Sequence, residues 1–436
     1  MKFKILIFYF LFLTFSGFAQ SISMPEFNLN KSIPGAAYAF SFVHITDVHV
    51  GEDYNQNGND YGGNGFDNDS VPYGDNSRPV RALKNAVTWI NENAAAKNIK
   101  FVIVSGDLTG SAEKSEMIHC RDILNKLQIP YVPIIGNHDI WPYVRYNYEA
   151  RYAYGDSVWN EVFDSVFTAN KFFFENWDDG TRLQRTYDSE DSLGHYFQNF
   201  SFEYDDFVFY GLDFNPRYHV HKAEPGIGPE AQLMDWNGGT FRWLKQQLAS
   251  NTHLGNENTI LIAHHPITDN LIMIASGFVF ERDEYDKMVS MLAPYKNNLA
   301  LWLSGHIHFD TDYYLSNILR VRTMAANKDF AQSRFEVVNV YQTQQVTGLK
   351  ENKNPELSCY PNPNNGIFNL ELNNIDKDAT LIITDLSGKI VLTENILQHQ
   401  DQTKYHFDFS TLPKGIYLLN ITNKNASLET IKFVIQ

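Results

Sequence analysis

Short, continuous apolar runs recur along the first three quarters of the chain, and each stops abruptly at polar residues. Five of these runs cover residues 42–46, 101–104, 133–135, 260–263 and 299–303. Apolar runs that do not alternate with polar residues are typical of strands buried on both faces of a sheet. In open α/β sheets the ligand site lies beyond the carboxyl ends of such strands. The pattern therefore predicts that five strand ends meet at one place.

Helical spacing separates several of these runs. Residues 81–97 and 112–127 carry apolar side chains at intervals of three and four, and residues 239–248 repeat the pattern before the fourth run. Alternation of strands and helices predicts parallel strands with helices on both faces of a sheet. Residues 140–192 break the pattern with many aromatic residues. They form either a lid over the site or a helical insertion with a small core of its own, and we favour the insertion.

The polar residues that follow the five runs are suited to metal and proton chemistry. They are the motifs Asp47-Val48-His49, Gly106-Asp107, Gly136-Asn137-His138-Asp139, His264-His265-Pro266 and Gly305-His306-Ile307-His308. Carboxylate, amide and imidazole groups without a thiolate favour first-row divalent or trivalent metals over calcium or a structural zinc site. Two of the motifs place donors two residues apart, and we expect an extended backbone to point such a pair to one side.

The five motifs, in this order, resemble those of the calcineurin-like metallophosphoesterase superfamily, and the resemblance spans residues 40–341. A lone Asp-x-His or Gly-Asp motif would more often be a turn or a cap, and Gly-Asn-His-Asp or Gly-His-x-His alone would be a metal site about as often as not. All five in order favour a metal site. The resemblance implies an α/β fold, a four-layer sandwich of two mixed sheets flanked by helices. Residues 194–202 and 207–212 resemble the paired strands that open the second half of that fold.

The resemblance also implies a role for each residue of the motifs. The ligands of a first metal would be Asp47, His49 and His308. Those of a second metal would be Asn137, His264 and His306, with Asp107 bridging both metals. We take His264 rather than His265 because the family ligand stands two residues before the proline. His138 matches a non-ligand histidine beside the leaving group, and Asp139 matches its orienting partner.

Composition narrows the class of substrate. The chain has 436 residues, of which 43% are hydrophobic, so it is long enough for a large core and a second domain. Its formal net charge of −16 disfavours general nucleic-acid binding, which depends on basic patches that neutralise phosphates. A small phosphoester remains compatible, because two bound cations would dominate the local field.

The N-terminal residues have the layout of a secretory signal peptide over residues 1–19, with lysines, a short apolar run and small residues before the cut. No later segment is long and uncharged enough to predict a transmembrane helix. The two cysteines, Cys120 and Cys359, fall in separate predicted domains, and we expect both to be free and buried. The catalytic domain would then cover residues 20–345.

A polar loop follows the first motif. Residues 51–76 are rich in glycine, asparagine and aspartate, and residues 53–58 resemble the first half of a calcium loop that begins at Asp53. Position 12 of such a loop would be Asn64 instead of the usual glutamate. Two interpretations stay open, a calcium site and an ordinary turn, and we favour the turn.

The sequence pattern changes after residue 345. Residues 346–356 have the composition of a linker, and residues 357–436 carry alternating strands and hairpin turns typical of a small all-β sandwich. The segments around Tyr360, Gly388, Gly415 and Phe433 resemble the C-terminal sorting domain of the bacterial type IX secretion system. The alternative is a carbohydrate-binding or adhesive β-sandwich.

Together these patterns predict an exported, binuclear metal-dependent phosphoric ester hydrolase. We expect two Mn, Fe or Zn ions, a metal-bridging hydroxide as the nucleophile and His138 as the general acid. The type IX secretion machinery would be its partner, and the protein would be secreted or held at the cell surface. A non-catalytic scaffold with the same fold and a glycan-binding adhesin are the alternatives. Monoesterase and diesterase activities both remain open, since no cationic role can be assigned to Arg78, Arg145 or Arg217.

Overall fold

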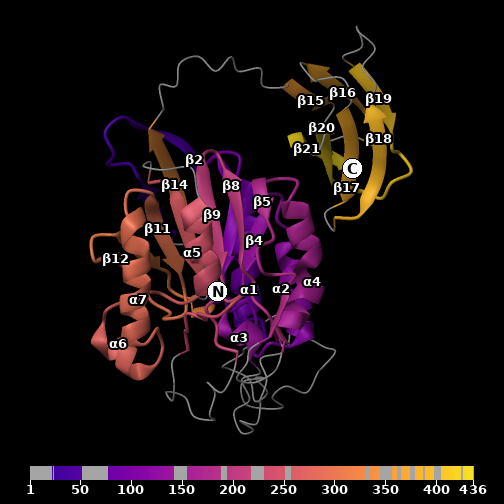
Figure 1. Cartoon of the computed structure of the whole chain (residues 1–436). Coiled ribbons are helices and arrows are strands. Elements are labelled where there is room, and N and C mark those ends of the chain that lie inside the picture. Colours follow the sequence, from indigo (N-terminus) through magenta and orange to yellow (C-terminus); the bar gives the residue numbers. More distant parts are fainter. Residues whose placement is uncertain are drawn as a thin grey trace, which may run out of the picture.

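The computed structural model describes residue 22 and residues 24–51, 77–141, 155–187, 194–217, 230–250, 257–329, 333–343, 356–360, 365–373, 379–385, 388–396, 404–423 and 426–435. Within these residues, two mixed β-sheets pack together and carry helices on their outer faces, and further strands form a C-terminal unit (Figure 1). This is the predicted α/β sandwich with a small all-β domain.

The first sheet has five strands in the order β1-β14-β2-β3-β4. They are β1 (Glu26–Leu29), β14 (Glu336–Thr343), β2 (Ala36–Ile45), β3 (Ile99–Ser105) and β4 (Tyr131–Ile134). β2, β3 and β4 are parallel to one another, and β14 runs antiparallel to β2. The carboxyl ends of β2, β3 and β4 therefore meet at one edge, as the apolar runs predict.

The second sheet has seven strands in the order β12-β13-β11-β10-β9-β8-β5. They are β12 (Thr311–Leu315), β13 (Leu319–Thr323), β11 (Leu299–Ser304), β10 (Thr259–Ala263), β9 (Phe207–Leu212), β8 (Phe200–Tyr204) and β5 (Glu175–Asp178). β9, β10, β11 and β13 are parallel, while β8 pairs antiparallel with β9. The predicted pairing of residues 207–212 is with residues 200–204, whereas residues 194–196 pair elsewhere. β10 and β11 are buried along their whole length, which explains their uninterrupted apolar sequences.

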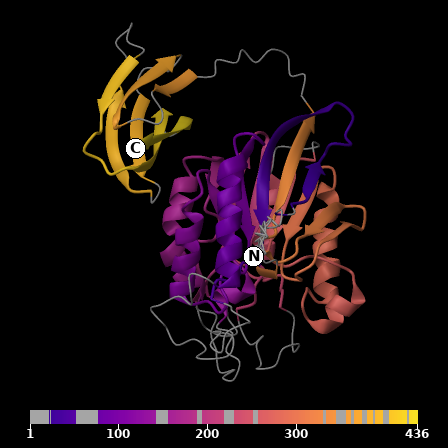
Figure 2. The same ribbon diagram turned by 180° about the vertical axis from the view of Figure 1, so that it is seen from behind.

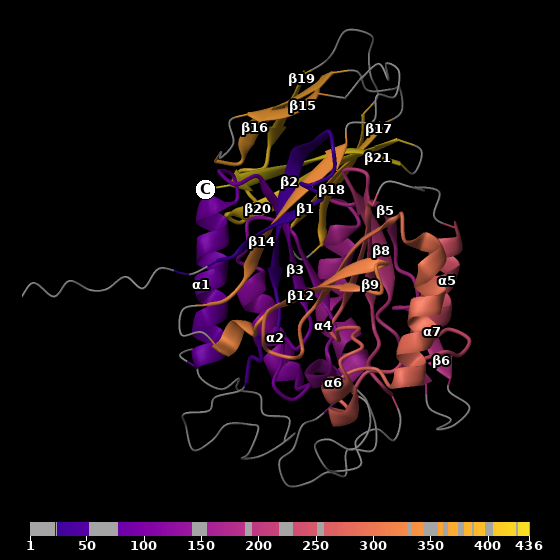
Figure 3. The ribbon, with the colours of Figure 1, turned by 90° about the vertical axis from the view of Figure 1, so that its left-hand side faces the viewer.

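Helices cover the outer face of each sheet. They are α1 (Arg78–Asn93), α2 (Lys114–Leu124), α3 (Asn137–Ile140), α4 (Gly155–Asn170), α5 (Thr240–Ser250), α6 (Leu271–Ser276) and α7 (Arg282–Leu292), with short 3-10 turns η1 (Ala293–Tyr295) and η2 (Asn327–Asp329). Figure 3 shows α1 on one side of the sheets and α5 and α7 on the other. The helices predicted for residues 81–97, 112–127 and 239–248 correspond to α1, α2 and α5, with ends shifted by a few residues.

Aromatic side chains fill the space between the two sheets. The ring of Phe42 in β2 lies 6.0 Å from that of Phe209 in β9, and the ring of Phe101 in β3 lies 5.6 Å from the same ring. Such edge-to-face pairs add to the free energy gained by burying the rings. They fix the two sheets face to face and so bring their carboxyl edges together.

The aromatic-rich insertion differs from its prediction. Trp159, Phe163 and Phe167 of α4, together with Phe174, belong to the main hydrophobic core and do not form a core of their own. α4 packs against α2 and β4, so these large rings extend the sheet's outer layer. β6 (Arg185–Tyr187) and β7 (Gly194–Tyr196) form a separate two-stranded sheet nearby.

The C-terminal unit contains two antiparallel sheets, β15-β16-β19 and β18-β17-β20-β21. Their strands are β15 (Glu356–Tyr360), β16 (Ile367–Asn373), β19 (Lys404–Asp408), β18 (Ile390–Ile396), β17 (Ala379–Asp385), β20 (Gly415–Asn423) and β21 (Ala426–Ile435). They enclose a separate core that includes Phe368, Ile383 and Phe433. Figures 1 and 2 show this unit at the end of the molecule opposite to α3 and α6.

The two cysteines are free, as predicted, but only Cys120 is fully buried, because Cys359 lies in β15 with part of its side chain exposed. In the part of the chain that the structure describes, no helix is long and apolar enough to span a membrane. The signal-peptide prediction for residues 1–19, the Asp53 loop and the greater part of the predicted linker lie outside the described residues.

Candidate metal centre

The predicted donors gather at the carboxyl edges of the two sheets. Asp47 and His49 follow β2, Asp107 follows β3 and Asn137 begins α3 after β4. From the second sheet, His264 follows β10, and His306 and His308 follow β11. The two edges are joined directly, because the His306 N–H, which follows β11, donates to Oδ2 of Asp47, which follows β2, at 3.0 Å.

The first group of donors consists of Asp47, His49 and His308. One ligand atom from each lies within 4.8 Å of the others. The Nε2 atom of His308 is 3.3 Å from Asp47 Oδ1, and the Nε2 atom of His49 is 3.9 Å from it. These are the three residues that the sequence predicts for a first metal.

Asp107 lies between the two groups of donors. Its Oδ2 atom is 3.6 Å from His49 Nε2 and 3.0 Å from His264 Nε2. Asp47, Asp107 and His264 form another set of donors within 4.8 Å of one another. A carboxylate in this place can reach donors of both groups, as expected of a bridge.

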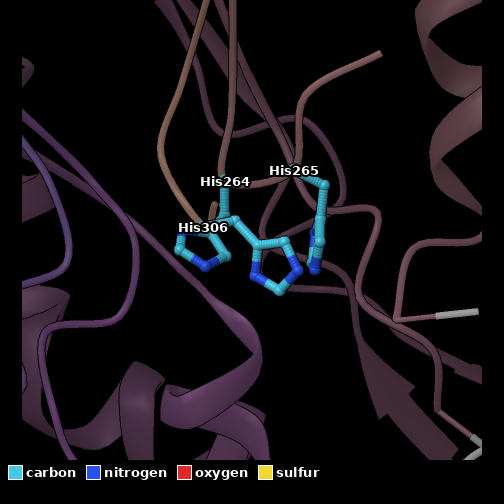
Figure 4. A group of neighbouring side chains, drawn as sticks. All are labelled: His264, His265 and His306. Carbon is cyan, nitrogen blue, oxygen red and sulfur yellow. The ribbon is translucent and has the colours of Figure 1, made fainter. Parts of the chain in front are cut away.

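The second group contains His264 and His306, and the structure adds His265 to them. One ligand atom from each of the three rings lies within 4.8 Å of the others (Figure 4). Asn137 is buried at the start of α3, and the next backbone N–H, that of His138, donates to Asp107 Oδ1 at 2.9 Å. The loop that carries Asn137 is thereby held against the centre.

His138 lies beside these donors with part of its side chain exposed. One ligand atom from each of His49, Asp107 and His138 lies within 4.8 Å of the others. The Nδ1 atom of His138 is 2.7 Å from the carbonyl oxygen of Gly110. Because a carbonyl only accepts, Nδ1 must carry a hydrogen, which leaves Nε2 as the other functional atom of the ring.

Asp139, which the sequence predicts to orient that ring, accepts hydrogen bonds from the loops on either side. Its Oδ1 atom accepts from the N–H and the hydroxyl of Thr109, both at 2.9 Å, and its Oδ2 atom accepts from the Gly136 N–H at 2.8 Å. Asp139 therefore ties the loop of His138 to the loop of Asp107.

The backbone at the donors is unusual. Asp47, His49, Asp107, His306 and His308 have φ angles between 51° and 71°, in the left-handed region. This corrects the expectation that an extended backbone aligns the paired donors. Non-glycine residues in this region cost free energy, and they cluster at functional sites where the surrounding structure enforces them.

Two motif glycines are required by close approach of the donors. A Cβ atom at Gly106 would overlap the ring of His264, and one at Gly136 would overlap the carboxylate of Asp107. Gly106 also has a φ angle of +96°, which favours glycine. The glycines therefore let side chains from neighbouring strands reach the same point.

Mutual interactions set the protonation of the donors. Burial raises the pKa of Asp47, but the adjacent His308 and His49 outweigh burial and hold it well below its usual range. Burial also raises the pKa of Asp107, but His264 and His138 outweigh burial and lower it. Burial lowers the pKa of His264, yet Asp107 and Asp47 raise it to about 9.

The pKa values of three other groups are shifted in the direction that favours the neutral form. Burial first, and then the charge of Lys328, lower the pKa of His49 well below its usual range. Burial, followed by the charge of His306, does the same for His265. Burial, with a smaller contribution from Asp107, raises the pKa of Asp139 to about 7. Neutral imidazoles beside ionised carboxylates are the forms in which these side chains bind metals.

The donors fit a metal centre on structural grounds. Asp47, Asp107 and His264 are buried, and the Nε2 atom of His264 is not aligned for a hydrogen bond although it lies 3.0 Å from Asp107 Oδ2. Closely spaced buried donors of this kind are explained by a shared cation.

Sequence reasoning missed two residues near the centre. The Oε2 atom of Glu230 lies 2.9 Å from His306 Nε2, at hydrogen-bond distance but not in hydrogen-bond alignment. Lys328 is buried, and its backbone N–H lies 3.5 Å from the Asp47 carbonyl oxygen. Neither residue belongs to a motif, so their positions follow only from the tertiary fold.

Arg217, a possible phosphate ligand by sequence, instead interacts with buried aspartates. Its guanidinium is fully buried, forms an ion pair with Asp213 and lies 3.6 Å from Asp156 Oδ2. Its Nη1 atom also donates to the Asn215 carbonyl, and Asn215 donates in turn to the Ile135 carbonyl. Arg217 therefore supports the loop that follows β4. Arg145 lies outside the described residues.

Comparison with solved structures gives distant likenesses. The chain is 13% identical to a dimetal phosphatase from Danio rerio, over 77% of this chain and 96% of that one, with a TM-score of 0.44. It is 13% identical to purple acid phosphatase PPD1 from yellow lupin (Lupinus luteus), over 92% of this chain and 55% of that one, with a TM-score of 0.34. These likenesses are too distant to carry an argument. No curated protein matches the chain.

Comparison with protein families divides the chain in two. The secretion system C-terminal sorting domain matches residues 358–436, and this domain indicates export by the type IX route to the cell surface or beyond. The calcineurin-like phosphoesterase family matches residues 40–310, which is more than half of the chain. The protein therefore belongs to the calcineurin-like phosphoesterase family and is a phosphoester hydrolase.

Proposed function

We propose that the protein is an exported, binuclear metal-dependent hydrolase of small phosphoric esters. The observation that carries this proposal is the position of Asp107, whose Oδ2 atom lies 3.6 Å from His49 and 3.0 Å from His264, one in each donor group. Two cations held by such a site would supply Lewis-acid activation of the phosphoryl group and of the attacking water.

Each side chain of the site has a proposed task. Asp47, His49 and His308 would hold the first metal, Asn137, His264 and His306 would hold the second, and Asp107 would be shared by both. The aspartate and histidine donors converge within 4.8 Å in overlapping sets, which supports this division, and Asn137 is buried at the start of α3. Burial of most of these donors would keep bulk water from competing with the phosphoryl oxygens for the metals.

His138 is the proposed general acid. Its Nδ1 atom is occupied by the Gly110 carbonyl at 2.7 Å, so its Nε2 atom is the one that can give a proton to a departing alkoxide. Asp139 holds this arrangement through its bonds to Thr109 and Gly136. The partial exposure of His138 leaves room for the leaving group beside it.

The test is metal-dependent turnover by the purified full-length chain. After removal of metals with a chelator, we expect hydrolysis of aryl phosphates to return with Zn²⁺, Mn²⁺ or Fe ions and to follow metal content. A panel of mono- and diesters assayed with elemental analysis would separate the two activities. Failure of every metal and ester to give turnover, in a folded protein that binds two metals, would favour a non-catalytic scaffold.

A further inference from the structure

His265 has no role in the proposed assignment of ligands, yet it lies inside the donor cluster. Its side chain is 0% exposed, and neither its Nδ1 nor its Nε2 atom hydrogen-bonds to any residue that the structure describes. Buried polar atoms in native proteins almost always have a partner, and an exception points to an ion or a water. The ring of His265 is therefore expected to contact an ion or a water molecule.

The neighbours of this ring show where that ligand would lie. Its centroid is 4.4 Å from that of His306 and 5.0 Å from that of His264. Figure 4 shows the three rings next to one another, and their residues follow β10 and β11. A donor atom from each ring lies within 4.8 Å of the other two, which is close enough for one cation to bind all three.

The backbone holds His265 in this place. Its carbonyl accepts from the indole N–H of the buried Trp302 at 3.2 Å, and Pro266 follows it in the chain. His264 is fixed separately, because its Nδ1 atom lies 2.9 Å from the Ser105 carbonyl and leaves Nε2 to face the carboxylates. The two consecutive histidines thus lie in the same region, but a contact with Trp302 holds His265 and a contact with Ser105 holds His264.

We propose that His265 is an additional nitrogen ligand of the second metal position, beside His264 and His306. The inference rests on the proposed function, because it assumes that metals occupy the centre. Three imidazoles favour Zn²⁺ or a similar borderline ion, whereas Mg²⁺ and Mn²⁺ prefer oxygen ligands. The second position would accordingly select zinc more strongly than the first, which has two imidazoles and carboxylates.

The experiment compares the full-length parent with His265→Gln and His265→Ala. Metal-free protein is titrated separately with Zn²⁺ and Mn²⁺ by calorimetry, and elemental analysis gives the metals bound per chain. Loss of a direct ligand should weaken Zn²⁺ at one site by about 100-fold or more, since even supporting residues cost 10- to 100-fold. The Mn²⁺ affinity should change much less. The absorption of the Co²⁺-loaded protein should also change.

The matched control is His44→Gln. His44 is another fully buried histidine near the same edge, but its Nε2 atom is 2.7 Å from Ser105 Oγ and it belongs to none of the donor sets. We expect its Zn²⁺ isotherm to equal that of the parent. A folded His265→Gln variant with the parent's Zn²⁺ affinity and Co²⁺ spectrum would overturn the inference and leave only a hydrogen-bonded water.

A second measurement needs no variant. In the parent labelled with ¹⁵N-histidine and loaded with ¹¹³Cd²⁺, metal coupling should appear on the rings of His49, His264, His265, His306 and His308. Coupling on all of these except His265 would overturn the inference while supporting the proposed function. A parent that binds no metal under any condition would contradict the proposed function itself, and the inference with it.

Discussion

Glu230 and His306 come within 2.9 Å of each other, from Oε2 to Nε2, although they are distant in the sequence. The Glu230 carboxylate approaches the ring outside the set of donors within 4.8 Å that joins His306 to His264 and His265. A carboxylate placed there favours a proton on Nε2 and so a free lone pair on Nδ1. Carboxylates that orient a metal-bound imidazole commonly act in this way.

Glu230→Gln should therefore weaken metal binding at the second position. We expect a loss of about 10- to 100-fold in affinity, because the imidazole loses the group that fixes its tautomer and orientation. Calorimetric titration of the metal-free chain with Zn²⁺ measures it. Glu281→Gln, an exposed carboxylate before α7, is the control. Equal isotherms for the parent and Glu230→Gln would show that the contact has no part in metal binding.

Much of the fold was predictable because buried strands carry a strong local signal. The apolar runs that end at Ser105, Ala263 and Ser304 are buried throughout, and the carboxyl ends of their strands meet where the polar motifs begin. Since parallel strands share one edge, the position of the centre followed from these runs alone.

The local geometry of the centre was not predictable in the same way. Spacing by two residues suggested extended strands at Asp47 and His49, whereas both have left-handed backbones. Contacts between loops of different strands impose this conformation, as in the bond from the His49 N–H to the Asp107 carbonyl at 2.9 Å. Glu230 gave no sequence signal, because its only link to the centre is through space.

Asp107→Ala should lose both metals and nearly all activity. Removing this carboxylate leaves two groups of donors without a shared anion between the two cations, so their repulsion is no longer offset. We expect turnover to fall by more than about 100-fold, together with metal content measured by elemental analysis. Retention of two metals per chain at full occupancy would show that Asp107 is not the bridge.

Deletion of residues 357–436 should leave a folded, active enzyme that stays in the periplasm. The C-terminal strands have a hydrophobic core separate from the two cores around the sheets, and they lie at the end opposite to α3. Metal content and turnover should thus match those of the full chain. Fractionation of the native host locates the protein. Normal appearance of the truncated enzyme outside the cell would contradict a sorting role.

Glu284 of α7 should make stability depend on pH. Burial, followed by the charges of Glu281 and Asp283, raises its pKa to about 7, against the hydrogen bond from the Leu233 N–H. In the unfolded chain the pKa is about 4.3. The folded state therefore binds the proton more tightly, so stability is full below about pH 4.3 and falls as the pH rises to about 7.

Glu284→Gln should remove this loss of stability at higher pH, because glutamine does not ionise. We expect the metal-free variant to gain stability over the parent by on the order of 1–3 kcal/mol at about pH 8, with the difference shrinking toward pH 4.3. Urea unfolding at several pH values measures it. Glu92→Gln, on the exposed face of α1, should show no such trend. A difference that stays constant across the range would mean that Glu284 does not titrate in this window.

His138→Ala should separate proton transfer from metal binding. His138 touches the centre through its backbone N–H, which donates to Asp107, and alanine retains that N–H. Both metals should stay bound. With alkyl phosphoesters we expect a rate loss of about 10²- to 10⁴-fold, because a poor alkoxide leaving group needs a proton from the enzyme. With nitrophenyl esters the loss should be much smaller, since nitrophenolate departs unaided.

The ratio of these two losses is what identifies the general acid. Asp139→Asn is the matched comparison, because Asp139 braces the same loop through Thr109 and Gly136 without bonding the leaving group. Disturbing the loop displaces His138 without removing its ring, so Asp139→Asn should give a smaller difference between the alkyl and aryl losses than His138→Ala gives. If His138→Ala slowed both esters equally, or released a metal, His138 would be a phosphate binder or a ligand, and the acid would have to be another group at the centre.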